Sequence, residues 1–158
     1  MIYDSMGFDC VFRPAEPSDY DELRRFLEAR WIELYSPHVL KRSVERFVRE
    51  DGAGQHLHLY MGSFELALVD DCIVGSTNRC DDCITAFFVA KRYRVNGIGS
   101  CLLHNAESSG GSYLEVAAFN TRAISFYQAR GWSRAGTFNE DVFGTGISSL
   151  SMTKRHTV

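Results

Sequence analysis

The sequence is poor in proline and has no long apolar run. It contains 3 prolines in 158 residues, and none of its apolar stretches approaches the roughly 20 residues that a membrane-spanning helix needs. Its first residues, MIYDSMGFDC, combine neither a basic start nor an apolar centre, so they lack the pattern of a secretory signal peptide. We therefore expect a cytoplasmic protein that does not bind membranes.

An excess of positive charge is also missing. The chain has 17 lysines and arginines against 20 aspartates and glutamates, which gives a net charge of -3. Because nucleic-acid binding depends mainly on neutralising phosphates with Lys and Arg, we expect no nucleic-acid partner. A cationic or amine substrate suits this charge better.

Disulfide frameworks and metal-binding clusters are missing too. The cysteines are an odd set without the spacing of a secreted framework, so we expect reduced thiols. Cys80 and Cys83 have the separation of half a zinc site, but no second Cys-x-x-Cys or His-x-x-x-His pair accompanies them. His56 and His58 would share one face if residues 55–61 formed a strand, yet such pairs are more often surface residues than ligands. We expect no metal.

The chain does contain enough apolar surface for one folded domain. Its residues are 45% hydrophobic, and no repeat or low-complexity segment interrupts them. A chain of this length buries roughly 70% of its unfolded surface on folding. We therefore expect a single domain over residues 1–158.

Alternating apolar residues predict several strands. Residues 64–69 and 73–78 alternate around Asp70 and Asp71, which favours a β-hairpin. Further strands are predicted at residues 8–15, 84–89, 112–118, 132–139 and 147–152.

Helices are predicted on both sides of these strands along the chain. Ser18 is expected to cap a first helix, with Asp21 at the capping-box position. Ser36 and Pro37 are expected to start a second helix, which closes near residues 51–52. Two more helices are predicted, one from residue 98 and one over residues 121–130. The order indicates an α/β protein in which about four helices flank a sheet.

A glycine loop lies between a buried strand and an amphipathic helix. The strand ends at Val89, the loop contains Gly97 and Gly99, and apolar residues recur at helical spacing from Ile98 onward. At a helix N-terminus the first backbone N–H groups lack intrahelical partners and the helix dipole is positive, which suits a phosphate. Glycines let ligand oxygens approach these amides closely.

Two common nucleotide-binding loops do not fit this segment. The Rossmann fingerprint needs a third glycine where this chain has Leu102, and seven residues separate Val89 from Gly97. A Walker A loop needs Gly-Lys-Ser or Gly-Lys-Thr, which occurs nowhere in the chain. A Rossmann oxidoreductase is therefore a distant alternative.

The segment resembles the acyl-CoA-binding motif of the GNAT superfamily of N-acetyltransferases. In that motif a strand ending in Val precedes (Arg or Gln)-x-x-Gly-x-(Gly or Ala) at the start of a helix, and here these positions are Val89 and residues 94–99. The chain departs from the common pattern at Lys91, where relatives often have Pro, and at Val95, where they often have Gly. Both departures affect the shape of the loop rather than its amides.

A second segment, residues 113–132, resembles the family pattern Leu-x-Val-x-x-x-Asn-x-x-Ala-x-x-(Phe or Leu)-Tyr-x-x-x-Gly-(Phe or Trp). The two motifs occur in the family's order and at its usual separation, and the resemblance covers residues 64–132 well. The second motif is most similar to the ribosomal-protein alanine N-acetyltransferase branch. The matching residues are Leu114, Val116, Asn120, Ala123, Phe126, Tyr127, Gly131 and Trp132.

The resemblance implies a mixed, mostly antiparallel sheet and an N-acetyltransferase that uses acetyl-CoA as co-substrate without a metal. The acetyl group would pass directly to a primary amine of a small molecule or a peptide. Val89 would hydrogen-bond the pantetheine through its backbone, and Arg94 would pair with a phosphate unless it is a solvated loop arginine. The coenzyme-binding set implied by the resemblance is Val89, Arg94, Val95, Asn96, Gly97, Ile98, Gly99, Ser100, Asn120 and Tyr127.

The resemblance also implies an acid and a base. Tyr127 would be the acid that serves the CoA sulfur, since a phenol keeps its proton near neutral pH; its alternative role is a buried aromatic anchor. Glu115 would be the base, although a solvated or ion-paired glutamate is the alternative. Asp82 and Glu65 are lesser candidates for the base, and many relatives use a water chain. Asn120 suits a helix N-cap and, by resemblance, a pantetheine contact.

The acceptor side is less defined. Trp31 and Tyr35 fall where family members commonly shape the acceptor pocket, with plain hydrophobic packing as the alternative. Asp82, next to Asp81, would attract a cationic amine unless it is a solvated hairpin end. Polyamines, aminoglycosides, amino acids and protein N-termini all remain open as acceptors.

A non-catalytic acyl-CoA sensor or interaction module is the main alternative function. The presence of both Tyr127 and Asn120 favours the enzyme. Exposed sheet edges would favour a homodimer.

Overall fold

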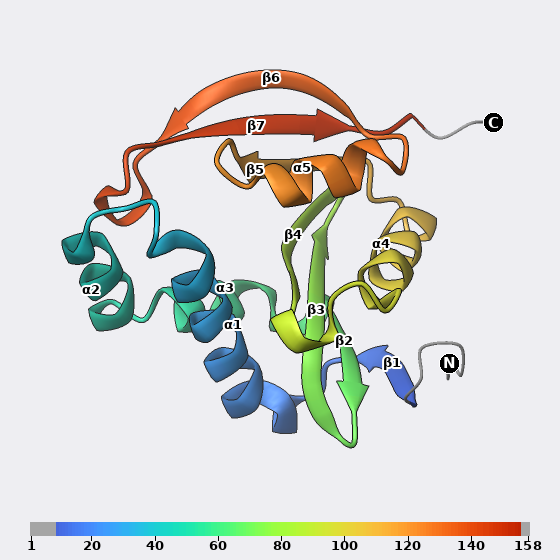
Figure 1. Cartoon of the computed structure of the whole chain (residues 1–158). Coiled ribbons are helices and arrows are strands. Elements are labelled where there is room, and N and C mark those ends of the chain that lie inside the picture. The colour runs from blue at the N-terminus through green and yellow to red at the C-terminus, as the bar shows by residue number, and fades with distance from the viewer. Residues whose placement is uncertain (1–8, 156–158) are drawn as a thin grey trace.

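A seven-stranded sheet with five α-helices forms the fold in the computed structural model, which describes residues 9–155 (Figure 1). The strands lie in the order β1-β2-β3-β4-β5-β7-β6, and β4 and β5 pair in parallel while the other neighbours are antiparallel. The strands are β1 (Cys10–Pro14), β2 (Phe64–Val69), β3 (Cys72–Cys80), β4 (Cys83–Val89), β5 (Tyr113–Ala117), β6 (Ser133–Glu140) and β7 (Ile147–Thr153). The helices are α1 (Tyr20–Tyr35), α2 (Lys41–Arg49), α3 (Gly52–Tyr60), α4 (Ile98–Ser108) and α5 (Thr121–Gln128).

This architecture confirms the predicted α/β fold with a mixed, mostly antiparallel sheet. The predicted hairpin is β2 and β3, and its turn residues Asp70 and Asp71 both have positive φ, at 50° and 60°. Two left-handed residues are what a tight two-residue hairpin needs. Within residues 9–155, no helix has both the length and the apolar character needed to cross a bilayer.

Alternating side chains give β2 two buried faces. Leu66 and Leu68 belong to a cluster with residues of α1, α2 and α3, whereas Ala67 and Val69 belong to a cluster with α4. Figure 1 shows α1, α2 and α3 on one side of β2 to β4 and α4 on the other. Helix α4 crosses β3 closely at Gly75, where an added Cβ would lie 3.1 Å from Leu102 Cδ1.

The parallel pairing of β4 with β5 covers only two residue pairs. Cys83 pairs with Tyr113 and Ile84 with Leu114, and the two strands then separate. Strand β5 continues along β7 on its other side, so β5, β7 and β6 form a second half of the sheet. Figure 1 shows β6 and β7 arching over α5 at one end of the molecule.

A bulge changes the direction of β4 beside this separation. Ser76 pairs with Phe88 and Asn78 with Thr85, so one residue of β3 faces two residues of β4. Ala86, one of those two, has φ 47°, which is a strained conformation for a residue with a side chain. The hydroxyl of Ser76 donates a hydrogen bond to the Ala86 carbonyl at 2.9 Å and holds the bulge in place.

The starts of the first two helices differ from the sequence prediction. A 3-10 turn occupies Pro17–Asp19, capped reciprocally by Glu16 and Asp19, and α1 begins after it rather than at a Ser18 cap. Ser36 ends α1, because its N–H still bonds to the Ile32 carbonyl at 2.9 Å. The following Pro37 has no N–H to extend the helix, so α2 begins later, at Lys41.

A fifth helix, α3, replaces the strand considered for residues 55–61. Helix α2 ends at Arg49, close to the predicted end at residues 51–52, and Asp51 then caps the start of α3, since its carboxylate accepts the Gly54 N–H at 3.1 Å. Because residues two apart lie on different sides of a helix, His56 is partly buried against Tyr60 and Phe64 while His58 is exposed. Residue 8 of the predicted first strand lies outside the described residues.

His56 gives the fold a pH dependence that can be measured. Burial lowers its pKa, whereas an unfolded histidine titrates near about 6.5. The unfolded chain therefore takes up this proton first as pH falls, and stability present at pH 7.5 is lost toward pH 5.5.

We expect His56→Gln to reduce the loss of thermal stability between pH 7.5 and 5.5, measured by circular dichroism. His58→Gln, on the same helix but exposed, serves as the control and should follow the wild-type loss. An unchanged loss in His56→Gln would contradict the role of the buried imidazole.

Candidate functional site

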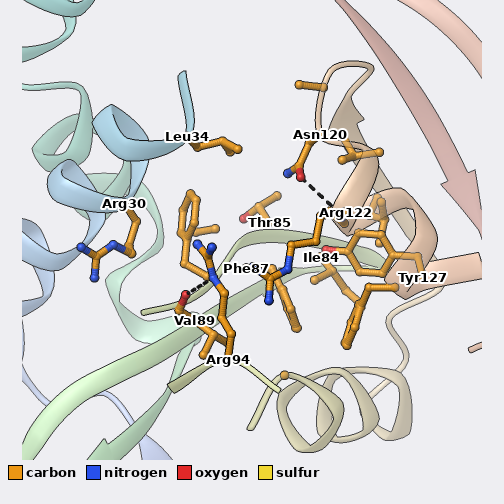
Figure 2. A pocket seen from close by; sticks show the side chains of 18 of the residues that line it. Arg30, Leu34, Ile84, Thr85, Phe87, Val89, Arg94, Asn120, Arg122 and Tyr127 are labelled. Atoms are coloured by element: carbon orange, nitrogen blue, oxygen red, sulfur yellow. Dashed lines mark hydrogen bonds between the residues drawn. The ribbon is translucent and has the colours of Figure 1, made fainter. Parts of the chain in front are cut away.

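A cavity of about 570 Å³ lies where β4 and β5 separate (Figure 2). Its walls come from the C-terminal half of α1, strands β4 and β5, the loop before α4, and α5. Helix α1 therefore lines one wall of the cavity and α5 lines another.

The glycine loop forms one end of this cavity. Gly97 has φ 87° and is the N-cap of α4, whose first N–H groups have no intrahelical partner. Val95, Gly97, Gly99 and Ser100 line the cavity, as does Val89 at the end of β4. This is the placement expected of a phosphate-binding loop.

Two members of the predicted coenzyme set are turned away from the cavity. The Asn96 side chain donates to the Arg94 carbonyl at 3.0 Å, which shapes the loop. The Ile98 side chain is fully buried in the cluster beneath α4. These two residues can therefore contribute to the site through their backbone amides only.

Arg94 lies at the cavity but is bound by the protein itself. Its Nε donates to the Val89 carbonyl at 3.1 Å (Figure 2), and its guanidinium lies 3.4 Å from the Glu33 carboxylate. Burial and the neighbouring charge of Arg122 lower the pKa of Arg94. A bound anion would relieve this crowding of positive charge.

The cavity is strongly basic although the protein is acidic overall. Four arginines line it, against one carboxylate, that of Glu115. Arg122 in the first turn of α5 and Arg130 just after that helix lie on either side of Tyr127 and were not among the predicted site residues. Figure 2 shows the Arg122 and Arg94 guanidinium groups extending toward the middle of the cavity. The positions of Arg122 and Arg130 in the second motif, on either side of Tyr127, could have indicated that they belong to the site.

Arg130 is held against the glycine loop. Its guanidinium donates to the Ser100 hydroxyl at 2.7 Å and to the Phe126 carbonyl at 2.9 Å, and it lies 3.7 Å from the centre of the Phe126 ring. This cation therefore stands next to the helix N-terminus, where it adds to the attraction for an anion.

Tyr127 lines the cavity from a buried position. Its ring contacts Phe87, Phe126 and Trp132, which fix its orientation. Burial raises its pKa, and no hydrogen bond or charge contributes to that shift. The phenol therefore keeps its proton and can donate it in a hydrogen bond within the cavity.

Asn120 acts as the N-cap of α5, as predicted. Its Oδ1 accepts the Ala123 N–H at 3.2 Å, shown by the dashed line in Figure 2. Asn120 also lines the cavity, so its side-chain N–H₂ is the group available to a ligand.

Glu115 lines the cavity from β5 and is exposed there. The Tyr113 hydroxyl donates to its Oε1 at 2.8 Å, and this bond, with burial as a lesser cause, raises the pKa of Tyr113 to about 12. By strand alternation Glu115 points away from the face on which Leu114 and Val116 pack with Tyr127. The carboxylate and the phenol thus approach the cavity from different faces.

Two weaker candidates for the base do not reach this cavity. Asp82 lies in the β3–β4 turn, where its carbonyl accepts the Ser112 N–H at 2.9 Å, and it does not line the cavity. The predicted substrate role of Asp82 therefore has no support in the geometry, because the turn is at the paired end of the two strands. Glu65 instead accepts a hydrogen bond from Asn105 at 2.9 Å.

Trp31 and Tyr35, which were predicted to shape the acceptor pocket, line the cavity from α1. Their rings are stacked with centres 4.4 Å apart, and Trp31 also stacks on Phe47 at 3.9 Å. The two rings thus pack against other aromatic residues and also line the cavity. Among residues 9–155, no three His, Cys, Asp or Glu side chains gather as a metal site would require.

Comparisons with known proteins agree with this geometry. A family model described as an acetyltransferase (GNAT) domain matches residues 35–156. The apo-form YjaB from Escherichia coli is similar in structure, with TM-score 0.73 and 17% identity, covering 94% of this chain and 99% of that one. No curated protein matches the sequence.

Two similar structures contain coenzyme A or a derivative of it. The PaiA N-acetyltransferase of Thermoplasma acidophilum, in complex with coenzyme A, has TM-score 0.68 and 19% identity, covering 93% of this chain and 99% of that one. Naa50 of Arabidopsis thaliana, in complex with the bisubstrate analogue CoA-Ac-MVNAL, has TM-score 0.63 and 19% identity, covering 93% and 99%. At these identities the likeness concerns the fold.

The conformation of Val95 generates a prediction about the loop. Val95 is 96% exposed and has φ 60°, a left-handed conformation that costs a β-branched residue about 1–2 kcal/mol. Asparagine tolerates this conformation, so we expect Val95→Asn to raise the free energy of unfolding by about 1 kcal/mol in chemical denaturation.

Val48→Asn is the matched control, because Val48 is an exposed valine within helix α2. It should give no gain in stability. If Val95→Asn were no more stable than the wild type, the loop would not be strained at this residue.

Proposed function

The chain belongs to the GNAT family of acetyltransferases, and on this premise we propose that it transfers an acetyl group from acetyl-CoA to a primary amine of a small molecule or a peptide. One observation carries the proposal. A single cavity is lined by the N-terminus of α4, by four arginines, by the buried phenol of Tyr127 and by the exposed carboxylate of Glu115. The helix N-terminus and the arginines suit a pyrophosphate, and the phenol and the carboxylate suit proton transfer.

The separation of β4 from β5 offers a place for the pantetheine arm. Their ladder ends after Ile84 and Leu114, so the backbone beyond these residues faces the cavity rather than a neighbouring strand. The pantetheine arm contains two amide groups and can bind there as an added strand would. Asn120 can donate a further hydrogen bond to it.

The phosphates would lie at the glycine loop. The amides of residues 97–100 supply N–H groups at a positive helix end. Arg122 of α5 and Arg130, which follows α5, would supply two guanidinium groups beside the loop. Charge-assisted hydrogen bonds of this kind are about twice as strong as neutral ones.

The reaction itself needs one bond formed and one broken. The neutral amine nitrogen attacks the thioester carbonyl carbon, a C–N bond forms, and the C–S bond breaks to leave the CoA thiolate. Glu115 takes the proton that the nitrogen loses. Tyr127 donates a hydrogen bond or its proton to the sulfur, because burial keeps the phenol protonated.

The bulge at Ala86 interrupts the pairing of β4 with β3 beside the cavity. Ala86, Phe87 and Phe88 all line the cavity, and the left-handed Ala86 breaks the regular pairing of β4 with β3. Backbone N–H groups released from a ladder can stabilise the oxyanion that forms at the thioester carbonyl.

Removing the acid or the base should slow turnover without loss of coenzyme. We expect Tyr127→Phe and Glu115→Gln each to lower kcat by about 100-fold or more, since general acid–base groups contribute about 10²–10⁴-fold. The measurement is thiol release from acetyl-CoA with a panel of primary amines. Coenzyme affinity, measured by calorimetry, should stay within about twofold of the wild type.

Glu45→Gln, an exposed glutamate on α2, is the control and should keep wild-type kcat. Coenzyme binding without amine-dependent thiol release in the wild type would favour an acyl-CoA sensor instead.

Arg122 tests the phosphate site separately. A charged hydrogen bond is worth about 1.5–3 kcal/mol, so we expect Arg122→Gln to weaken CoA binding by about tenfold to 100-fold. S-acetylpantetheine lacks the phosphates and should react equally well with both proteins. Arg49→Gln, on exposed α2, is the control. If Arg122→Gln reduced the reaction with S-acetylpantetheine as much as the reaction with acetyl-CoA, a contact between Arg122 and the phosphates would be contradicted.

A further inference from the structure

A second, smaller cavity shares a wall with the first. It has a volume of about 120 Å³, and Trp31 and Tyr35 line both cavities. The rest of its wall comes from Glu140 at the end of β6, from Val142 and Thr145 in the β6–β7 connection, and from Ile147 of β7. Neither the glycine loop nor α5 contributes to it, so it lies on the α1 side of the site.

The rings that form this cavity are fixed by packing. Trp31 is stacked between Tyr35 and Phe47, and Phe143 meets Trp31 edge-on with ring centres 6.2 Å apart. The Ser43 hydroxyl donates to the Gly144 carbonyl at 2.9 Å and ties α2 to the β6–β7 connection. The cavity is therefore formed before any ligand arrives.

One carboxylate, that of Glu140, lines this cavity, and only one of its two oxygens has a hydrogen-bond partner among the described residues. Glu140 Oε2 accepts a hydrogen bond from the Ser149 hydroxyl at 2.8 Å, and the described residues give Oε1 no partner. The negative charge of Glu140, after burial, helps raise the pKa of Tyr35 to about 12. The Glu140 carboxylate thus lies close enough to Tyr35 for its charge to act on the phenol.

A second acceptor in the wall lacks a partner. Thr145 Oγ1 is buried and hydrogen-bonds to none of residues 9–155. No Lys or Arg among these residues lines the cavity. Arg46 approaches the connection at Gly144 but forms an ion pair with Glu50. The cavity is therefore the electrostatic opposite of the arginine-rich cavity beside it.

We propose that this second cavity binds an ammonium group of the acceptor, so that the acceptor is an alkyl diamine or polyamine carrying a cationic nitrogen besides the one that is acetylated. Resting on the proposed function, this inference names the substrate class. A carboxylate and a hydroxyl are groups that hydrogen-bond an alkylammonium ion, and apolar rings pack against its carbon chain.

The volume restricts the ligand further. A cavity of about 150 Å³ holds benzene, so this one accommodates about five heavy atoms, such as a short aminoalkyl chain. A sugar ring with its hydroxyl groups is larger. We place one end of a diamine in this cavity and the other amine in the first cavity, past Trp31 and Tyr35, which line both. The product would be a monoacetylated diamine whose second nitrogen keeps its charge.

The test compares 1,4-diaminobutane with butylamine, which is the same chain with one nitrogen removed. We expect calorimetry on the CoA-saturated protein to show 1,4-diaminobutane binding at least tenfold more tightly than butylamine. Glu140→Gln preserves shape and should remove that preference. In thiol release it should raise the KM for the diamine at least tenfold and leave both kcat and the kcat/KM of butylamine unchanged.

Thr145→Val is a second variant and should weaken diamine binding by a smaller factor, while Glu45→Gln should leave it unchanged. Equal binding of the two amines by the wild type, or a diamine affinity unaltered by Glu140→Gln, would overturn the proposal. Binding is measured separately from turnover. Tight diamine binding without thiol release would therefore support the ammonium site and contradict only the proposed transfer reaction.

Discussion

The early end of the β4–β5 ladder is the constraint on which the rest of the site depends. After Cys83–Tyr113 and Ile84–Leu114 the strands separate, yet each keeps a full partner on its other side, β3 for β4 and β7 for β5. Helix α4 packs against both halves of the sheet, through Leu102 on one and Leu103 on the other, and holds them at this opening. The opening can therefore stay empty of side chains without loss of the fold.

Two cavities of opposite charge meet at the pair Trp31 and Tyr35. The larger cavity carries four arginines and a helix N-terminus, whereas the smaller one carries Glu140 and no cation among the described residues. The net charge of -3 indicates the charge of neither cavity. A bound ligand is affected mainly by the charged groups within about a Debye length of it. Local charge thus distinguishes two cavities that share Trp31 and Tyr35 as lining residues.

Structural features that depend on residues close together in the sequence could be predicted. The β2–β3 hairpin, the Asn120 cap and the buried position of Tyr127 follow from turn residues, capping chemistry and helical spacing. Helix α3 was missed because Asp51 and Gly52 serve equally well to end one helix and to begin another. The opening beside β4, the bulge at Ala86 and the approach of Glu140 to Tyr35 join distant segments, so local pattern could not reveal them. The position of Asp82 outside the cavity likewise depends on the pairing of distant strands.

The position of bound coenzyme tests the central claim most directly. A crystal structure with CoA should show the pantetheine arm between β4 and β5, the pyrophosphate at the amides of residues 97–100, and the sulfur next to the Tyr127 hydroxyl. Coenzyme bound outside the opening, or with its sulfur remote from Tyr127, would contradict the account.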